Sequence, residues 1–191
     1  MPLSVHVFDP TRSPDLDKLF ATDPVADRCW CMWFISRVAD FHEAGRDGNR
    51  QAFHELVERE TDPLGLIAYR GTEPVGWCAA GPRRRYARVL RAPTLKKRNR
   101  DEDGLVWLVP CFFIREDARH AGVATALLTA AVDLARKKGA AAVEGFPLAG
   151  TKPRSGGSDF MTGVEDIFSA VGFQANVRPS DNRVIMRLEL S

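Results

Sequence analysis

A short stretch of small and basic residues, 119–124, has the composition of a phosphate-binding loop. It reads Arg-His-Ala-Gly-Val-Ala and joins a strongly apolar segment to the clearest helical pattern in the chain. A helix N-terminus offers unpaired N–H groups and a partial positive charge, and small residues such as Gly122 let a phosphate approach the backbone. The spacing fits neither the GxGxxG fingerprint nor a P-loop. We therefore predict a pyrophosphate site, with a tight turn closed by Gly122 as the alternative.

A second unusual stretch, residues 29–34, reads Cys-Trp-Cys-Met-Trp-Phe. Soft and aromatic side chains of this kind suit a binding surface for a ligand with an aromatic or aliphatic body. The alternative is a place in the core, because cysteine and tryptophan are often well buried. Cys29 and Cys31 lack the two-residue gap of a zinc finger, and a disulfide between such near neighbours would be strained. We expect no metal here.

Strand and helix patterns surround these two stretches. Strands are expected at residues 4–8, 65–70, 73–80, 105–114, 140–146, 173–177 and 184–190. Helices are expected from Ser13, which caps a helix with Pro14 in its first position, and at residues 27–41, 49–60, 121–138 and 164–171. Residues 82–103 are polar and expected to be mostly irregular. This order predicts an α/β fold with a mixed central sheet flanked by helices.

The chain resembles the GCN5-related N-acetyltransferase (GNAT) family. Arg119-x-x-Gly122-x-Ala124 is similar to the family signature, and it stands between the expected strand and helix as in that family. The Gly172-Phe173 pair after the last helix also matches. The resemblance extends over residues 4–190 and implies a single GNAT-like domain, residues 1–191. It implies an N-acetyltransferase that uses acetyl-CoA as co-substrate and no metal.

The resemblance also implies which residues bind acetyl-CoA. The pantetheine arm would lie along the buried strand, at Phe112, Phe113 and Ile114, where a backbone N–H can stabilise the developing oxyanion. Arg119 opens the motif. The residues expected at the pyrophosphate are His120, Ala121, Gly122, Val123, Ala124 and Thr125. The early helical region forms part of the acceptor wall in relatives, which implies acceptor contacts for Cys29, Trp30 and Trp33.

An amine needs a base before it can attack, and Glu144 is the candidate. It lies on the expected strand where some relatives carry a catalytic glutamate, and partial burial raises a carboxyl pKa toward the value that a base needs. The alternative is a structural or solvent-facing role. Relatives often carry a tyrosine, which protonates the leaving thiolate, where this chain has Phe168. Water, Ser169 or Cys111 would have to take the role of this general acid. This departure keeps open a non-catalytic acyl-CoA-binding module.

The basic stretch at residues 83–100 allows several interpretations. It has no acidic residue and its one aromatic is Tyr86. A solvated loop is the plain interpretation, but such a run can also attract an acidic acceptor, phosphates of coenzyme A, or RNA. Without interleaved aromatics the RNA-associated alternative is weak. Lys152 and Arg154 are further candidates for a phosphate contact.

The composition bounds the remaining classes. The chain has 191 residues, 45% of them hydrophobic, a formal net charge of +2 and four cysteines. These values suit one globular domain and give no case for a polycation, a disulfide scaffold or a membrane span. We expect a cytoplasmic protein whose partners are acetyl-CoA and a small amine of unknown identity. A homodimer, common among relatives, stays open.

Overall fold

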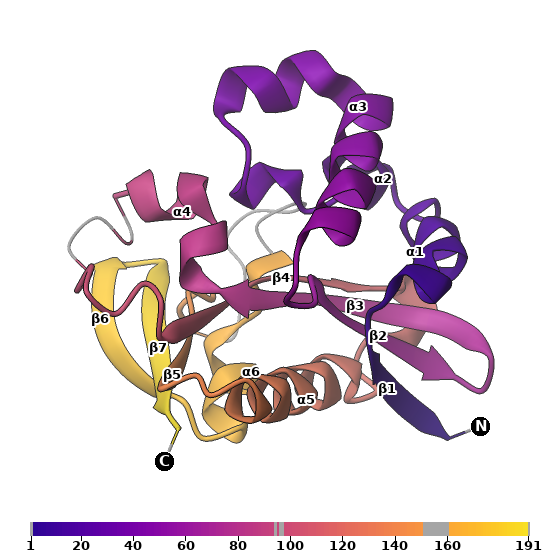
Figure 1. The fold of residues 1–191 in the computed structure, drawn as a ribbon. Coiled ribbons are helices and arrows are strands. Elements are labelled where there is room, and N and C mark those ends of the chain that lie inside the picture. The colour runs from indigo at the N-terminus through magenta and orange to yellow at the C-terminus, as the bar shows by residue number, and fades with distance from the viewer. Residues whose placement is uncertain (1, 94, 96–97, 151–160, 191) are drawn as a thin grey trace.

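A seven-stranded sheet runs through the molecule with helices on both faces (Figure 1). The computed structural model describes residues 2–93, 95, 98–150 and 161–190. The strands are Leu3–Val7 (β1), Gly65–Arg70 (β2), Glu73–Pro82 (β3), Val106–Ile114 (β4), Ala142–Gly145 (β5), Gln174–Ser180 (β6) and Arg183–Glu189 (β7). Their order is β1-β2-β3-β4-β5-β7-β6. β4 and β5 pair in parallel and the other neighbours are antiparallel, which confirms the predicted mixed sheet.

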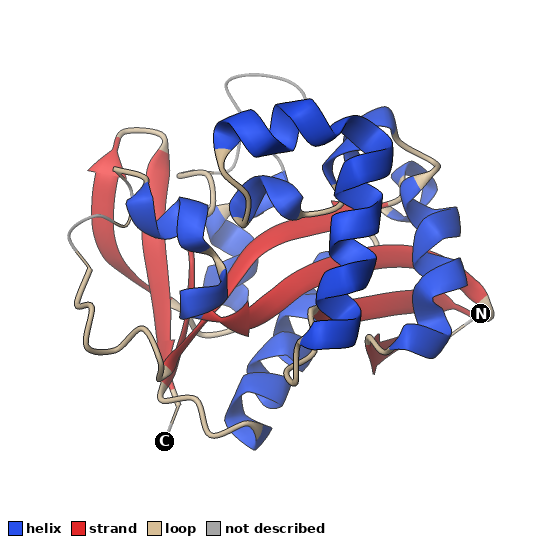
Figure 2. Cartoon of the chain, turned by 45° about the horizontal axis from the view of Figure 1, so that its top comes forward, coloured by secondary structure: helices blue, strands red, loops and turns tan. Residues whose placement is uncertain are grey.

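The helices form two layers on this sheet. They are Ser13–Phe20 (α1), Pro24–Cys29 (α2), Val38–Arg59 (α3), Ala87–Arg91 (α4), Val123–Lys137 (α5) and Glu165–Ala170 (α6). α5 and α6 lie on one face and α1 to α4 on the other (Figures 1 and 2). Each layer has its own apolar core, and the neighbouring β4 residues Phe112 and Phe113 point into opposite cores. No helix in the described part of the chain is long and apolar enough to span a membrane.

After α1, the helices before β2 begin and end at other residues than the sequence predicted. A 3-10 turn, Pro10–Arg12, capped by the Asp9 side chain, leads directly into α1 at Ser13. The two expected helices at 27–41 and 49–60 are redistributed into α2, a 3-10 turn at Met32–Phe34 and α3, which kinks at Gly45 with φ 60°. Glycine accepts this left-handed backbone without the Cβ clash that other residues meet, so the kink can form inside a helical pattern.

The basic stretch after β3 is tied to the sheet, so the expectation of a solvated loop is wrong for Arg83 and Arg85, although Arg84 between them is exposed. Arg83 is 1% exposed and Arg85 is 9% exposed. Arg85 donates to Glu60 and to the backbone carbonyls of Asp62, Pro63 and Ala80. A buried guanidinium is stable only with such partners, and these two have them. Residues 94, 96 and 97 of this stretch, and both Lys152 and Arg154, lie outside the described residues.

Candidate active site

The strand β4 has an open edge over its second half. It pairs with β3 as far as Ile114, but with β5 only over Val106 to Val109. β5 ends at Gly145, and no other described strand pairs with β4 beyond that point. Backbone groups alternate in direction along a strand. Because the N–H of Arg115 bonds to Val75 on β3, those of Phe112 and Ile114 face the open edge. An extended ligand can bond there as a strand would.

The loop after β4 exposes the N-terminus of α5. Gly122 is the N-cap residue with φ 76°, and no described side chain caps the helix. His120 is also left-handed, with φ 59°, which its sequence position did not reveal. The first intrahelical bond runs from Ala126 to the Gly122 carbonyl, so the preceding N–H groups of α5 lack intrahelical partners. A Cβ on Gly122 would meet no described atom within 4 Å. This geometry suits a phosphate.

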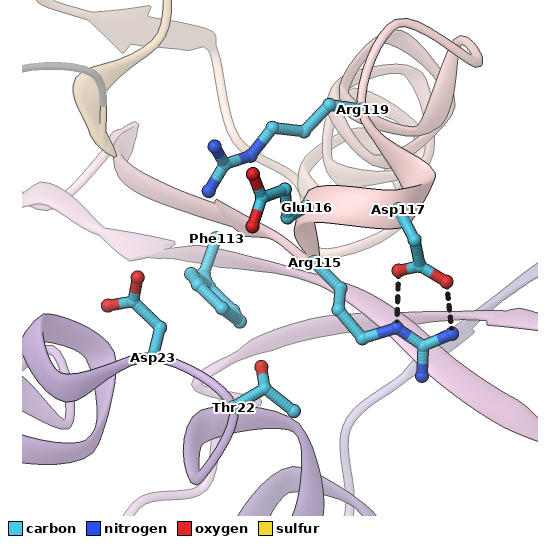
Figure 3. A pocket seen from close by; sticks show the side chains of 7 residues that line it. All are labelled: Thr22, Asp23, Phe113, Arg115, Glu116, Asp117 and Arg119. Atoms are coloured by element: carbon cyan, nitrogen blue, oxygen red, sulfur yellow. Dashed lines mark hydrogen bonds and ion pairs between the residues drawn. The ribbon is translucent and has the colours of Figure 1, made fainter.

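A pocket of about 460 Å³ adjoins the end of β4 (Figure 3). It is lined by Thr22, Asp23, Phe113, Arg115, Glu116, Asp117 and Arg119. The guanidinium of Arg115 is paired with Asp117 at 2.6 and 2.9 Å. Arg119 donates from Nε to the Ile114 carbonyl at 3.2 Å, which joins the motif arginine to β4. The pocket therefore brings Phe113 and Arg119 together with the α1–α2 turn, which the sequence did not indicate as a site.

The carboxylate of Glu144 is buried and paired on both oxygens. The side chain is 5% exposed. Oε2 accepts from Nη1 of Arg83 at 2.8 Å, and Oε1 accepts from Nη1 of Arg187 at 2.9 Å. Each carboxylate oxygen thus accepts a charge-assisted hydrogen bond, which competes with the approach of an amine. The base assignment stays a prediction, and this geometry favours the alternative of a structural acceptor.

Further ion pairs extend from Glu144 into the basic stretch. Arg83 also donates to Asp103 from Nε at 2.8 Å, and Arg98 donates to both carboxylate oxygens of Asp103. These arginines lower the pKa of Asp103, with the hydrogen bond from Arg98 as the largest cause. Arg187 reaches Glu102, which lies just beyond the basic stretch, at 2.8 Å. The network holds the segment after β3 against β5 and β7.

Comparison with known proteins identifies the family. The sequence matches the family model described as Acetyltransferase (GNAT) family over residues 29–146, more than half of the chain. The chain belongs to this family. The earlier resemblance is thereby confirmed, and this GNAT protein is an N-acetyltransferase whose acetyl donor is acetyl-CoA. No curated protein matches the sequence.

Solved GNAT structures share the fold over the whole chain. PaiA N-acetyltransferase of Thermoplasma acidophilum, in complex with coenzyme A, is 13% identical with a TM-score of 0.56 and covers 99% of both chains. YncA of Salmonella typhimurium, with its cofactor acetyl-CoA, is 14% identical with a TM-score of 0.56, over 99% of this chain and 94% of its own. An N-acetyltransferase of Staphylococcus aureus Mu50 is 12% identical with a TM-score of 0.58 over all of both chains. At these identities the likeness concerns the fold.

Phe168 of this GNAT protein fills an apolar position beside the open edge. Its side chain is fully buried, 6.0 Å from the ring of Phe112 and 5.1 Å from that of Phe173. The backbone of Gly145 lies so close that a Cβ there would come within 2.2 Å of the Phe168 ring. Among the proposed substitutes for an acid, Ser169 is exposed. A hydrogen bond with Cys31 and burial raise the pKa of Cys111, so its thiol keeps its proton.

The stretch expected at the acceptor wall divides into core and surface. Trp30 is 1% exposed and packs on Phe20 with ring centroids 5.0 Å apart, so it is a core residue. Trp33 is 37% exposed. Trp30 and Cys31 are both left-handed, with φ 47° and 56°, and they end α2. Burial raises the pKa of Cys29 to about 12. No group of three or more metal-binding side chains is found within the described ranges.

Proposed function

We propose that this GNAT enzyme moves the acetyl group directly to the primary amine of a small molecule, without a covalent enzyme intermediate. The observation that supports it is the junction of two features: the open edge of β4 continues through Arg119 into the uncapped N-terminus of α5. That arrangement suits an extended arm ending in a pyrophosphate. Acetyl-CoA supplies the activated acetyl thioester, and the chain supplies binding, orientation and backbone electrostatics.

The proposed binding roles follow the elements. Phe112, Phe113 and Ile114 would hold the arm along β4, with exposed N–H groups of the strand available to a developing oxyanion. Arg119 and the loop residues His120, Ala121, Gly122, Val123, Ala124 and Thr125 would hold the pyrophosphate. Cys29 and Trp33 remain candidates for the acceptor side, which α1 to α4 cover (Figure 2). Coenzyme A thiolate is a good leaving group, so the absence of a hydroxyl at Phe168 is compatible with turnover.

The test is calorimetric titration with acetyl-CoA, followed by a panel of small primary amines assayed by release of coenzyme A. Saturable binding with amine-dependent release supports the proposal. Tight binding without release over the panel supports instead the non-catalytic acyl-CoA-binding module that Phe168 motivates. Absence of binding contradicts both. A homodimer and a cytoplasmic location stay proposals, and light scattering on the same sample measures the oligomeric state.

Replacing Phe168 with tyrosine is expected to destabilise the protein without raising kcat. The new hydroxyl would extend from the ring that already touches Gly145, into surroundings made of Phe112, Gly163 and Phe173. A buried hydroxyl without a partner costs about 1–3 kcal/mol. Chemical denaturation and the coenzyme A release assay measure both effects. Phe173→Tyr adds a hydroxyl to the neighbouring ring as a control. A kcat gain seen only with Phe168→Tyr would show that the hydroxyl reaches the thiolate.

A further inference from the structure

Arg88 is held flat against Trp33 on the surface formed by α4 and the 3-10 turn Met32–Phe34. Its Cζ lies 3.3 Å from the centroid of the Trp33 ring. Trp33 itself is braced by Phe41, with ring centroids 5.1 Å apart in a T-shaped pair. An arginine stacked on an aromatic face keeps its planar N–H groups free at the edge. Stacking thus fixes the guanidinium in position without using its N–H groups.

One of those donors is buried without a partner. Nη1 of Arg88 is shielded from solvent and bonds to no atom in the described part of the chain. Neither an ion pair nor a hydrogen bond of the Arg88 side chain occurs among the described residues. Burial lowers the pKa of this guanidinium, and the one opposing influence is the Cys29 thiol. Buried donors are almost always satisfied in native proteins, so an unsatisfied one calls for a role.

Arg88 differs from the other buried or half-buried arginines of this stretch, whereas Arg84, Arg91 and Arg100, unpaired among the described residues, are exposed. The donors of Arg83, Arg85 and Arg98 bond to carboxylates and backbone carbonyls. Those arginines hold the segment in place, whereas the half-buried Arg88 side chain makes no such bond among the described residues. No carboxylate of the described residues pairs with the guanidinium of Arg88.

Arg88 also lies beside the expected acceptor wall. Phe34 follows Trp33 directly and its ring is 6.2 Å from that of Phe146, the residue after the end of β5. β5 ends where β4 begins its open edge. Arg88 partly offsets the rise in the pKa of Cys29, which is expected at the acceptor wall, so the two side chains lie near each other. The aromatic turn therefore connects the guanidinium to the point where the two strands separate.

We infer that Arg88 binds a carboxylate of the acceptor, so that the small amine is an amino acid rather than a simple amine or a polyamine. This inference rests on the proposed function. A guanidinium presents a planar fork that matches a carboxylate. The exposed face of Trp33 and the Cys29 thiol offer an apolar surface for the side chain of such an acceptor. The amine would then point toward the end of β5.

The experiment compares amino acids with their amides. kcat/KM is measured for L-leucine and L-phenylalanine and for the corresponding amides, in wild type, Arg88→Gln and Arg88→Lys. The acid-to-amide ratio is expected to fall about tenfold to a hundredfold in Arg88→Gln, the range of a charge-assisted hydrogen bond. Arg88→Lys is expected to retain part of the ratio. Differences in amine basicity cancel because each ratio is compared between enzymes.

A matched control and a second readout keep the outcomes separate. Arg91→Gln changes an exposed arginine of the same helix and is expected to leave the ratio unchanged. Binding of the product N-acetyl-L-leucine and of its amide is also titrated calorimetrically, which needs no turnover. A ratio that is unchanged in Arg88→Gln overturns the inference. Failure of the wild type to bind acetyl-CoA overturns the proposed function instead, and acetyl-CoA affinity and thermal unfolding check each variant for an intact fold.

Discussion

Replacing Gly122 with glutamate is expected to weaken acetyl-CoA binding at least about a hundredfold while leaving a folded protein. The side chain would project into the space beside the uncapped N-terminus of α5, where a Cβ on residue 122 would have no described atom within 4 Å. It brings a carboxylate to the place where a pyrophosphate would sit. Losing two charge-assisted hydrogen bonds at about 1.5–3 kcal/mol each weakens binding by at least about a hundredfold.

The cost to stability is expected to be small. Gly122 has φ 76°, where any other residue loses roughly 1–2 kcal/mol. A negative charge near a helix N-terminus offsets part of that loss. Calorimetric titration with acetyl-CoA measures the binding, and thermal unfolding measures the stability.

Gly139 provides a matched control at the other end of the same helix. Its φ is 75°, and a Cβ there also meets no described atom within 4 Å. Gly139→Glu carries the same backbone cost without reaching the phosphate site, so its affinity for acetyl-CoA should equal that of the wild type. Equal affinity of Gly122→Glu and Gly139→Glu would remove the pyrophosphate site from the N-terminus of α5.

Local sequence patterns were sufficient to predict the elements that carry the donor site. The strand at residues 65–70 has the predicted bounds, and β4 and α5 begin within two residues of them. Continuous apolar character and helical spacing are properties of neighbouring residues, so they can be recognised in the sequence. The Arg119–Ala124 motif lies between the same two elements, which is why the family resemblance was specific.

Contacts between distant segments were beyond the reach of those patterns. Glu144 is 61 residues from Arg83 and 43 from Arg187, and nothing in the local sequence of any of the three indicates the pairing. The left-handed turn at Trp30 and Cys31 uses residues that rarely adopt that conformation. It separates Trp30, in the core, from Trp33, on the surface. The free donor of Arg88 appears only when all its neighbours are in place.

Replacing Glu144 with glutamine is expected to destabilise the fold much more than it slows the enzyme. A glutamine keeps the size of the side chain, but its NH₂ group would face the N–H donors of either Arg83 or Arg187. Removing one partner of a buried ion pair costs about 3–5 kcal/mol. At roughly 2–4 °C per kcal/mol for a chain of this size, the melting temperature should fall on the order of 10 °C.

Glu189 supplies the control, because it pairs with the same arginine but is exposed. Its side chain is 71% exposed and lies 2.6 Å from Nε of Arg187. Exposed pairs contribute about 0–1 kcal/mol, so Glu189→Gln should barely change the melting temperature. The comparison separates loss of a buried carboxylate from loss of any partner of Arg187.

Turnover of Glu144→Gln, measured well below its melting temperature, then decides between the two roles of Glu144. A structural acceptor predicts a kcat within about tenfold of wild type and a pH profile of the same shape, since general-base catalysis contributes about 10²–10⁴-fold. A general base predicts instead a collapse of kcat and loss of the acidic limb of the profile, whatever the change in melting temperature. The two guanidinium bonds of Glu144 lead us to expect the first pattern. The carboxylate would then act at a distance, by holding the arginine-rich segment that presents Arg88 against the sheet.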